Sequence, residues 1–284
     1  MRENMDSPHL SKERKGVKIH PFADVDSKAE LEDGVVIGPG VFVGPNVHIG
    51  SNNWIGANVI IDGKVKIGSN NRIFPGACIG LEPQDLKYKG ALTEVQIGNG
   101  NTIRECVTIN RATEENEYTK VGDGNLLMAY CHLGHNCEVR NDVVMSNSVQ
   151  VAGHVVIEDR AVVGGCLGIH QFVHIGHLAM VGGMTRVDRD VPPYCLAEGH
   201  PGRLRGLNRV GIKRSGLEII NKEEYRQLQK IWNLLFKSEN VIADSLKIAK
   251  QEKLMDASLK LCNFIESSIT KRRRGPMPIL ATAN

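Results

Sequence analysis

An aliphatic residue recurs every sixth position along most of this chain. The series runs from Ile19 to Ile79, resumes from Ile97 to Ile109, and runs again from Val121 to Val187, giving 26 anchors that are all aliphatic or Met. Gly follows the anchor in 12 of these hexads, and the residue two before the anchor is usually small. A period of six matches neither the 3.6 of a helix nor the alternation of one long strand.

A short strand followed by a tight turn does satisfy a period of six, because Gly tolerates turn conformations that other residues avoid. Hexapeptide repeats of this kind build a parallel β-helix, whose core is filled by the anchors and the small corner residues. Three hexads make one triangular coil, so residues three hexads apart lie about 4.8 Å above one another. The crossover rule alone favours right-handed coils.

Breaks in the phase divide the chain. They predict loops near residues 80–96 and 112–120 within a β-helix that spans 17–191. Helical spacing of apolar residues then appears, for example at Leu228, Ile231, Trp232 and Leu235. We therefore expect a mainly β fold, with an α-helical C-terminal domain over 192–270 and flexible termini at 1–16 and 271–284.

Composition narrows the class of protein. No apolar run approaches the roughly 18 residues of a membrane span, and the first sixteen residues are too polar for a signal peptide. Seven cysteines without a CxxC pair fit reduced thiols, so we expect a cytosolic protein. From residue 192 onward, 17 Lys and Arg face 9 Asp and Glu. This excess predicts either an acidic partner or a solvated helix surface, and no nucleic-acid motif accompanies it.

The string CHLGHNC, residues 131–137, has the residue types and close spacing from which zinc sites are often built. The coil register separates its members. Cys131 and Cys137 each stand two residues before an anchor, which predicts that they fill the core. His132 and His135 are off the two inward positions, so we expect their rings to point outward.

Three histidines fall at one corner of successive coils. His135, His154 and His170 follow anchors that are one coil apart, by two, three and one positions respectively. His174 and His177 flank an anchor at the next corner and are weaker candidates. A single outward histidine is common on a purely structural surface. A column of three outward rings is less typical of such a surface.

A histidine with an ordinary pKa near 6.5 is suited to take a proton from a hydroxyl or amine that attacks an activated acyl group. Such a transfer also needs a donor for the oxyanion. The turn Ala152-Gly153-His154 offers a backbone N–H beside the histidine column. These features permit acyl transfer.

Several strings together resemble a known family in order along residues 17–240. They are QDLKY (84–88), RECVTINRAT (104–113), NLLMAYCHLGHNCEV (125–139), VAGHVVI (151–157), GIHQF (168–172), DVPPY (190–194) and GLNRVGIKRSG (206–216). The family is that of the UDP-N-acetylglucosamine 3-O-acyltransferases.

This resemblance implies a left-handed β-helix and a cytoplasmic homotrimer. It also implies transfer of a 3-hydroxyacyl chain from acyl carrier protein to the 3-hydroxyl of UDP-N-acetylglucosamine, the first step of lipid A biosynthesis. The resemblance implies no metal, no organic cofactor, no nucleic-acid partner and no transmembrane segment. The basic C-terminal third would suit an acidic carrier protein.

The resemblance also assigns roles, at sites that would lie between adjacent subunits. His135 would be the general base, and Gly153 would supply the oxyanion N–H. Gly183 falls where family members set acyl length. The remaining matched positions would bind substrate: Asp85 and Lys87 at the nucleotide sugar or the pantetheine and acyl region, His132, His154, His170 and Gln171 lining the same cleft, and Asn208 and Arg214 near the uridine and phosphates, where a guanidinium suits phosphate well.

The chain departs from the family's pattern at four positions. Asn136 stands where Asp is common, which predicts a slower or pH-shifted enzyme because an amide stabilises imidazolium less than a carboxylate does. Asn110 stands where many relatives have His, and Val210 and Ser215 replace a charged pair near the nucleotide.

Three alternatives stay open at the level of the sequence. An N-acyltransferase acting on a 3-amino UDP-sugar would share the donor chemistry. A zinc hydratase of the gamma carbonic anhydrase type uses the same coil with histidines from neighbouring subunits. A non-catalytic β-helix scaffold is the third, disfavoured by the histidine column and the two loops.

Overall fold

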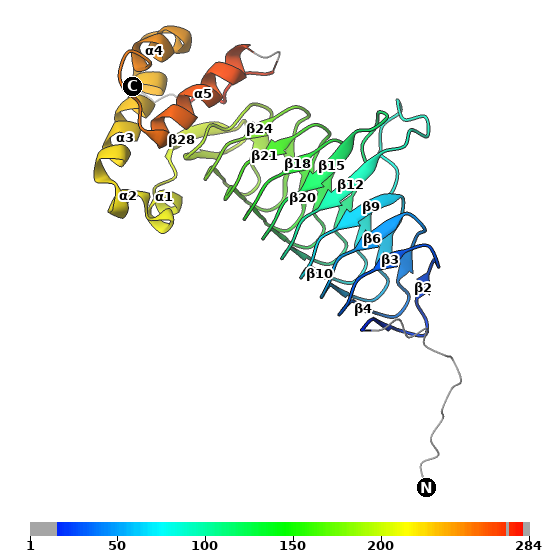
Figure 1. Ribbon diagram of the computed structural model, residues 1–284. Helices are drawn as coiled ribbons and strands as arrows, with labels where there is room; N and C mark the ends of the chain where they lie inside the picture. Colours follow the sequence, from blue (N-terminus) through cyan, green and yellow to red (C-terminus); the bar gives the residue numbers. More distant parts are fainter. Residues whose placement is uncertain (1–15, 271–272, 281–284) are drawn as a thin grey trace.

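The structure is a computed structural model that describes residues 16–270 and 273–280. It is a prism of stacked coils, with the helices gathered at its C-terminal end (Figure 1). Each coil contributes one short strand to each of three parallel sheets. The hexad anchors end these strands, so the predicted parallel β-helix is confirmed.

The three sheets form the sides of the prism. Sheet A contains β1 (Lys18–Ile19), β4 (Val36–Ile37), β7 (Trp54–Ile55), β10 (Arg72–Ile73), β13 (Thr102–Ile103), β16 (Leu126–Leu127), β19 (Val144–Met145), β22 (Val162–Val163), β25 (Met180–Val181), β27 (Cys195–Glu198) and β28 (Arg203–Leu207). Sheet B contains β2 (Asp24–Val25), β5 (Phe42–Val43), β8 (Ile60–Ile61), β11 (Cys78–Ile79), β14 (Thr108–Ile109), β17 (His132–Leu133), β20 (Val149–Val151), β23 (Leu167–Ile169) and β26 (Arg186–Val187). Sheet C contains β3 (Glu30–Leu31), β6 (Val47–Ile49), β9 (Lys64–Ile67), β12 (Glu94–Ile97), β15 (Tyr118–Val121), β18 (Glu138–Val139), β21 (Val156–Ile157) and β24 (His174–Ile175).

The strand register locates the two loops. Most paired anchors are three hexads apart, as in Leu133 and Val151. Ile79 instead pairs with Ile109, five hexads on, and Ile109 pairs with Leu133, four hexads on. The extra residues therefore lie after β11 and after β14, at the corner where the chain passes from sheet B to sheet C.

A column of asparagines runs through one buried corner. Asn53, Asn71, Asn101 and Asn125 each stand two residues before an anchor of sheet A and are at most 1% exposed. The side-chain oxygen of each accepts the backbone N–H of the next member, or of Val143 at the end of the column, at 2.8 Å. Because every amide is satisfied, the ladder fixes the register of successive coils without leaving a buried polar group unpaired.

The coil ends in a hairpin rather than in a helix. The sequence predicted a helical domain from residue 192, yet β27 adds to sheet A beside β25, and β28 returns antiparallel to it. Alternating burial at Cys195 and Ala197 explains this strand, because their side chains extend the core of the prism. The helices α1 (Arg209–Ser215), α2 (Leu217–Ile220), α3 (Lys222–Lys237), α4 (Ile242–Ala249) and α5 (Asp256–Thr270) follow.

The apolar stripe predicted on the third helix is buried as expected. Leu228, Ile231, Trp232 and Leu235 face inward from α3, which packs against α4 and α5. The Asn221 side chain caps α3 by accepting the N–H of Glu224.

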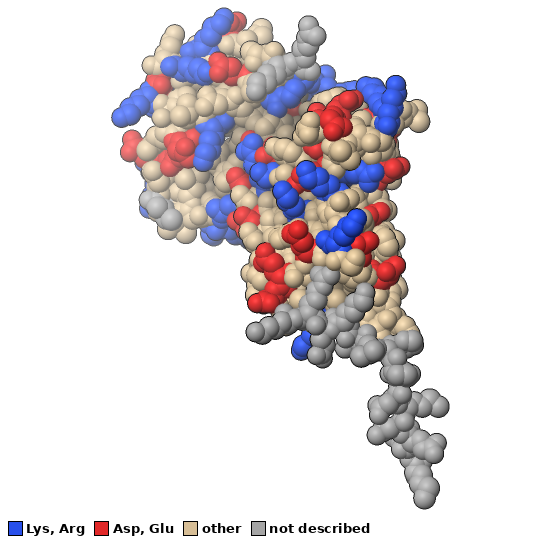
Figure 2. Space-filling view, turned by 45° about the vertical axis from the view of Figure 1, so that its right-hand side comes forward, with Lys and Arg blue, Asp and Glu red and all other residues tan. Residues whose placement is uncertain are grey.

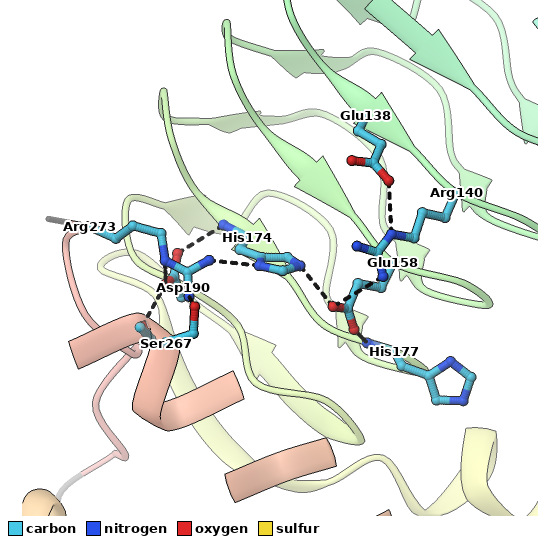
Figure 3. Close-up of polar contacts among 9 residues, drawn as sticks. Glu138, Arg140, Glu158, His174, His177, Asp190, Ser267 and Arg273 are labelled. Carbon is cyan, nitrogen blue, oxygen red and sulfur yellow. Dashed lines mark hydrogen bonds and ion pairs between the residues drawn. The ribbon is translucent and has the colours of Figure 1, made fainter. Parts of the chain in front are cut away.

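Residues 273–280 return to the end of the prism. β-bridges join this segment to Asp190 and Leu204. The Arg273 guanidinium lies 3.2 Å from the Asp190 carboxylate and donates to Nδ1 of His174 at 2.7 Å (Figure 3).

The flexible C-terminus that the sequence predicted from residue 271 is therefore not found over 273–280, where ion pairing and the buried Met277 hold the chain. Residues 271–272 and 281–284 lie outside the described residues, as does the predicted flexible N-terminus apart from Gly16. In the described part of the chain, no helix is long and apolar enough to cross a membrane.

The asparagine column yields a stability prediction. Asn101→Ala removes the acceptor for two N–H groups of Asn125, and a buried donor left unpaired costs about 1–3 kcal/mol. Asn99→Ala is the matched control, because Asn99 bonds to Asp123 in an exposed column where water replaces it, and its cost is within about 0.5 kcal/mol. Urea unfolding measures both, and equal losses would contradict this account of the column.

Candidate active site

Three successive coils build the candidate site at the corner between sheets B and C. The first loop leaves this corner after β11, the second leaves it after β14, and the turn that carries His135 follows β17. The loops fold over that turn, so His135 is only 6% exposed. His135 does not join the apolar core of the prism, and its low exposure arises because the loops cover the position that a bare coil would leave open.

Both nitrogens of the His135 ring have defined surroundings. The side-chain oxygen of Asn136 lies 2.8 Å from Nδ1. Because an amide oxygen only accepts, Nδ1 carries the proton, and the neutral ring keeps its lone pair on Nε2. The nearest acidic oxygen to Nε2 is Oδ2 of Asp85, at 3.7 Å. His135 is thus held in the tautomer that a general base at Nε2 requires.

Gly153 lies directly below His135, in the next coil, and a Cβ at this position would overlap the imidazole ring. Within the described residues, the N–H of Gly153 has no hydrogen-bond acceptor. The absence of a side chain therefore lets the ring sit over the backbone, and it leaves a free donor close to the ring.

The predicted histidine column is only partly formed. The rings of His135 and His154 meet edge to face with centroids 5.0 Å apart, but the next ring in the stack is Phe172, 4.8 Å from His154. His170 is exposed and accepts from Arg274 at 3.0 Å. The three histidines follow their anchors by different numbers of residues, so they share a corner without stacking as one column.

His132 and His170 instead line a neighbouring hollow on the face of sheet B. It measures about 410 Å³, and Gln150 and Arg186 also line it. The His132 Nδ1 lies in hydrogen-bond contact with the Thr108 hydroxyl at 2.7 Å.

The first loop presents Asp85 and Lys87 to the site. The Asp85 carboxylate accepts the backbone N–H of Lys87 at 3.0 Å, and this bond is the main reason why the pKa of Asp85 lies below its ordinary value. The charge of His135 and the Thr113 hydroxyl lower this pKa further. The Lys87 side chain is exposed, as is that of Gln171.

Burial also acts on the histidines. It lowers the pKa of His132 and of His154 below the ordinary value, and the positive charge that His135 carries when protonated lowers both further. Both rings are therefore neutral at pH 7, while Asp85 is ionised.

Asn208 and Arg214 lie elsewhere in the single chain, at a hollow of about 1060 Å³ between sheet A and the helices. The buried Asn208 amide donates to the Leu178 carbonyl and accepts from Gly211, so it caps α1. Arg214 is exposed on that helix. Gly183 lies at another turn, after β25, and is exposed. One chain thus does not bring all the predicted residues together.

The other departures from the family pattern have structural partners. Asn110 donates to the Glu82 carbonyl at 2.8 Å and so holds the first loop against the coil. The Ser215 hydroxyl donates to the Ile212 carbonyl within α1, and Val210 is exposed on the same helix.

Two residues that the sequence analysis did not single out also shape the site. Arg111 donates to the Tyr88 hydroxyl at 2.8 Å and to the Gly80 carbonyl at 2.9 Å, which braces the first loop. Glu117 accepts from the Asn136 side chain at 2.6 Å. Their only sequence signal is position, because both lie beside breaks in the hexad phase.

The cysteines of the CHLGHNC string are core residues, as predicted. Cys131 and Cys137 are at most 1% exposed, and their thiols donate to the carbonyls of Ser146 and Ala152 at 3.1 Å. Burial raises the pKa of Cys137 to about 12. Over residues 16–270 and 273–280, no group of three or more His, Cys, Asp and Glu side chains is arranged to hold a metal ion.

The second group of histidines belongs to a separate polar cluster (Figure 3). His174 lies between Arg273 and Glu158, with its Nε2 2.9 Å from Oε1 of Glu158. The His177 backbone N–H donates to the same carboxylate at 2.7 Å. This cluster ties the C-terminal segment to sheet C, away from the His135 turn.

We predict that Gly153→Ala displaces the His135 ring, because the added methyl group needs the space that the imidazole occupies. The ring contact between His135 and His154, measured by nuclear Overhauser effects, should weaken. Gly168→Ala is the control for stability, since a Cβ there meets nothing within 4 Å. An unchanged contact in Gly153→Ala would contradict the packing described.

A second prediction concerns pH. Since burial lowers the folded pKa values of His132 and His154, the unfolded state binds more protons at acidic pH, so the stability of the fold is highest above about pH 6.5, the unfolded value, and decreases as the pH falls through the folded values. In an NMR titration, both ring signals should titrate below about pH 6.5, assigned through His132→Gln and His154→Gln. Midpoints above that value would show that the rings are not desolvated.

Comparisons with known proteins find relatives in both sequence and structure. The family model described as UDP N-acetylglucosamine O-acyltransferase, domain 2, matches residues 190–277. The acyl-[acyl-carrier-protein]–UDP-N-acetylglucosamine O-acyltransferase of Synechocystis sp. is 50% identical over 221 residues, covering 78% of this chain and 79% of the relative. That of Thermodesulfovibrio yellowstonii is 43% identical over 253 residues, covering 88% and 97%.

Among solved structures, the UDP-N-acetylglucosamine acyltransferase from Campylobacter jejuni superposes with a TM-score of 0.84 at 35% identity, over 93% of this chain and all of that one. The match includes the coil and the C-terminal helices, which confirms the left-handed β-helix with a helical C-terminal part. Because this chain is 50% identical to the Synechocystis relative over most of the length of both, it belongs to the acyl-[acyl-carrier-protein]–UDP-N-acetylglucosamine O-acyltransferase family.

Proposed function

We propose that this protein transfers a 3-hydroxyacyl chain from acyl carrier protein to the 3-hydroxyl of UDP-N-acetylglucosamine, the first step of lipid A biosynthesis. The names of the relatives give the coarser activity, O-acylation of UDP-N-acetylglucosamine from acyl-[acyl-carrier-protein]. The observation that carries the proposal is the position of His135 Nε2 against Gly153, whose N–H is free, while Asn136 engages Nδ1 of the same ring.

The proposed reaction uses this pair in sequence. His135 Nε2 takes the proton from the sugar 3-hydroxyl as its oxygen attacks the thioester carbonyl. The Gly153 N–H donates to the oxyanion that forms. Collapse of the tetrahedral intermediate breaks the carbon–sulfur bond, and the imidazolium returns the proton to the leaving thiolate of the carrier protein.

The surrounding charges support this sequence. The neutral rings of His132 and His154 leave His135 free of a second positive charge at pH 7. The ionised Asp85 carboxylate, 3.7 Å from Nε2, favours the imidazolium that forms during the reaction. We assign Asp85, Lys87, His132, His154, His170 and Gln171 to substrate binding around this centre.

We infer that a homotrimer completes the site. Asn208 and Arg214, proposed for the uridine and phosphates, line a different hollow from the histidines in a single chain, so a neighbouring subunit would bring them opposite His135. Leu86, between Asp85 and Lys87 at the tip of the first loop, is fully exposed. An apolar side chain presented in this way suits contact with another subunit. Gly183 would set acyl length from its turn.

The basic C-terminal part would receive the acidic carrier protein, in the cytoplasm. Figure 2 shows Lys and Arg side chains interspersed with Asp and Glu over the helical part, at the upper left of that view. Residues 192 onward hold 17 Lys and Arg against 9 Asp and Glu, which supports long-range attraction of an anionic partner.

The test is an acyl-transfer assay with UDP-N-acetylglucosamine and a series of 3-hydroxyacyl carrier proteins. His135→Ala should lower kcat by about 10²–10⁴-fold, the usual contribution of a general base. His48→Ala is the control, since His48 lies on sheet C near the N-terminal end and pairs with Glu32. Full turnover by His135→Ala would remove the proposed base. Faster acylation of a 3-amino acceptor, or activity that depends on bound zinc, would replace the proposed reaction.

A further inference from the structure

We propose that Glu117 is a positioning residue for His135 and acts through the side chain of Asn136. This inference rests on the proposed role of His135 as the general base. The second loop, which carries Glu117, would then be part of the catalytic arrangement, although Glu117 itself touches neither substrate nor reacting atoms.

The contacts form a chain of two hydrogen bonds. The Asn136 amide nitrogen donates to Oε2 of Glu117 at 2.6 Å, and the Asn136 amide oxygen accepts from His135 Nδ1 at 2.8 Å. A carboxylate only accepts, so Glu117 determines which end of the amide faces the histidine. The backbone N–H of Thr113 donates to the same amide oxygen at 3.2 Å and favours the same orientation.

The orientation of the amide decides the tautomer of the ring. With its oxygen toward His135, Asn136 requires a proton on Nδ1 and leaves the lone pair on Nε2, beside Gly153. A reversed amide would present its N–H groups to Nδ1, and the ring proton would then favour Nε2. That tautomer cannot accept a proton at the reacting position.

Both partners are held in place by the fold. The Glu117 carbonyl accepts from Glu94 of β12 at 3.1 Å, and the Glu117 carboxylate also accepts from the Glu114 N–H at 3.3 Å. The Asn136 N–H donates to the Thr119 hydroxyl at 2.9 Å. The backbone of Asn136 has φ of 60°, a left-handed conformation that asparagine tolerates better than most residues.

The charge on Glu117 also determines the effect of introducing a carboxylate at position 136. Asn136→Asp would bring two carboxylates within hydrogen-bond distance, where they repel each other. The exchanged pair Glu117→Gln with Asn136→Asp removes this repulsion, because the glutamine amide can donate to the new carboxylate. The effect of a carboxylate at 136 should therefore depend on residue 117.

The experiment compares Glu117→Ala, Glu117→Gln, Asn136→Asp and the double variant Glu117→Gln/Asn136→Asp in the full-length enzyme. Steady-state kinetics would give kcat and KM, and ¹⁵N chemical shifts would report the tautomer of the His135 ring. We expect Glu117→Ala to lower kcat about tenfold, the value of one hydrogen bond to a charged group, with KM for the nucleotide sugar little changed. The Nε2-protonated tautomer should become populated.

We expect Glu117→Gln to keep the amide orientation but shift the acidic limb of the kcat/KM profile to lower pH, because a negative charge near the imidazolium is lost. The other charged or titratable groups that face this ring, namely Asp85, Lys87, His132 and His154, are the same in every variant. Glu114→Gln removes a charge from an exposed side chain of the same loop and is the matched control.

Asn136→Asp should be impaired, and the double variant should recover most of its kcat. Parental kcat and tautomer in Glu117→Ala would overturn the proposal, as would a double variant no better than Asn136→Asp. The His135 tautomer separates this outcome from failure of the proposed function. If His135→Ala were fully active while Glu117→Ala still changed the ring tautomer, the base would be wrong and the positioning contact right.

Discussion

The stacking register of three hexads per coil is the constraint on which the rest of this structure depends. Backbone hydrogen bonds between coils and the inward column of anchors act on the same residues, so a slip by one position would expose the anchors along the whole prism. The asparagine column enforces the same register at one corner. A turn position therefore has a fixed neighbour above and below it, which is how Gly153 comes to lie under His135.

The two loops use this register without disturbing it. Each lengthens its coil by a whole number of hexads, which keeps the anchors in phase, and the extra residues emerge at the same corner as the His135 turn, two coils and one coil before it. Because backbone pairing fixes both ends of each loop, the two preceding coils bring Asp85 to the His135 ring and Glu117 to the neighbouring Asn136. A local, repetitive core thus positions a non-repetitive site.

The difference between the repetitive core and the non-repetitive site also determines what the sequence could predict. The coil, its loops and the buried thiols of Cys131 and Cys137 follow from a period that a reader can count, because each depends on neighbours one coil away. The hairpin at 195–207, the burial of His135 and the contact of Glu117 with Asn136 depend on segments that meet only after the coil has formed. The packed segment 273–280 is of this kind, since its partners Asp190 and Leu204 are separated from it in the sequence by all five helices.

A rigid prism also limits how a substrate can be enclosed. Its outer faces are sheets that cannot close over a ligand, so a wall opposite the His135 corner must come from loops, from the helical part or from a second copy of the chain. In the single chain, the first loop covers His135, but its tip at Leu86 remains fully exposed, and Asn208 and Arg214 line a hollow elsewhere. Assembly of subunits with the first loop of one facing the Asn208 and Arg214 hollow of the next would explain both the open side of the site and the exposed Leu86. The proposed chemistry therefore depends on the proposed trimer.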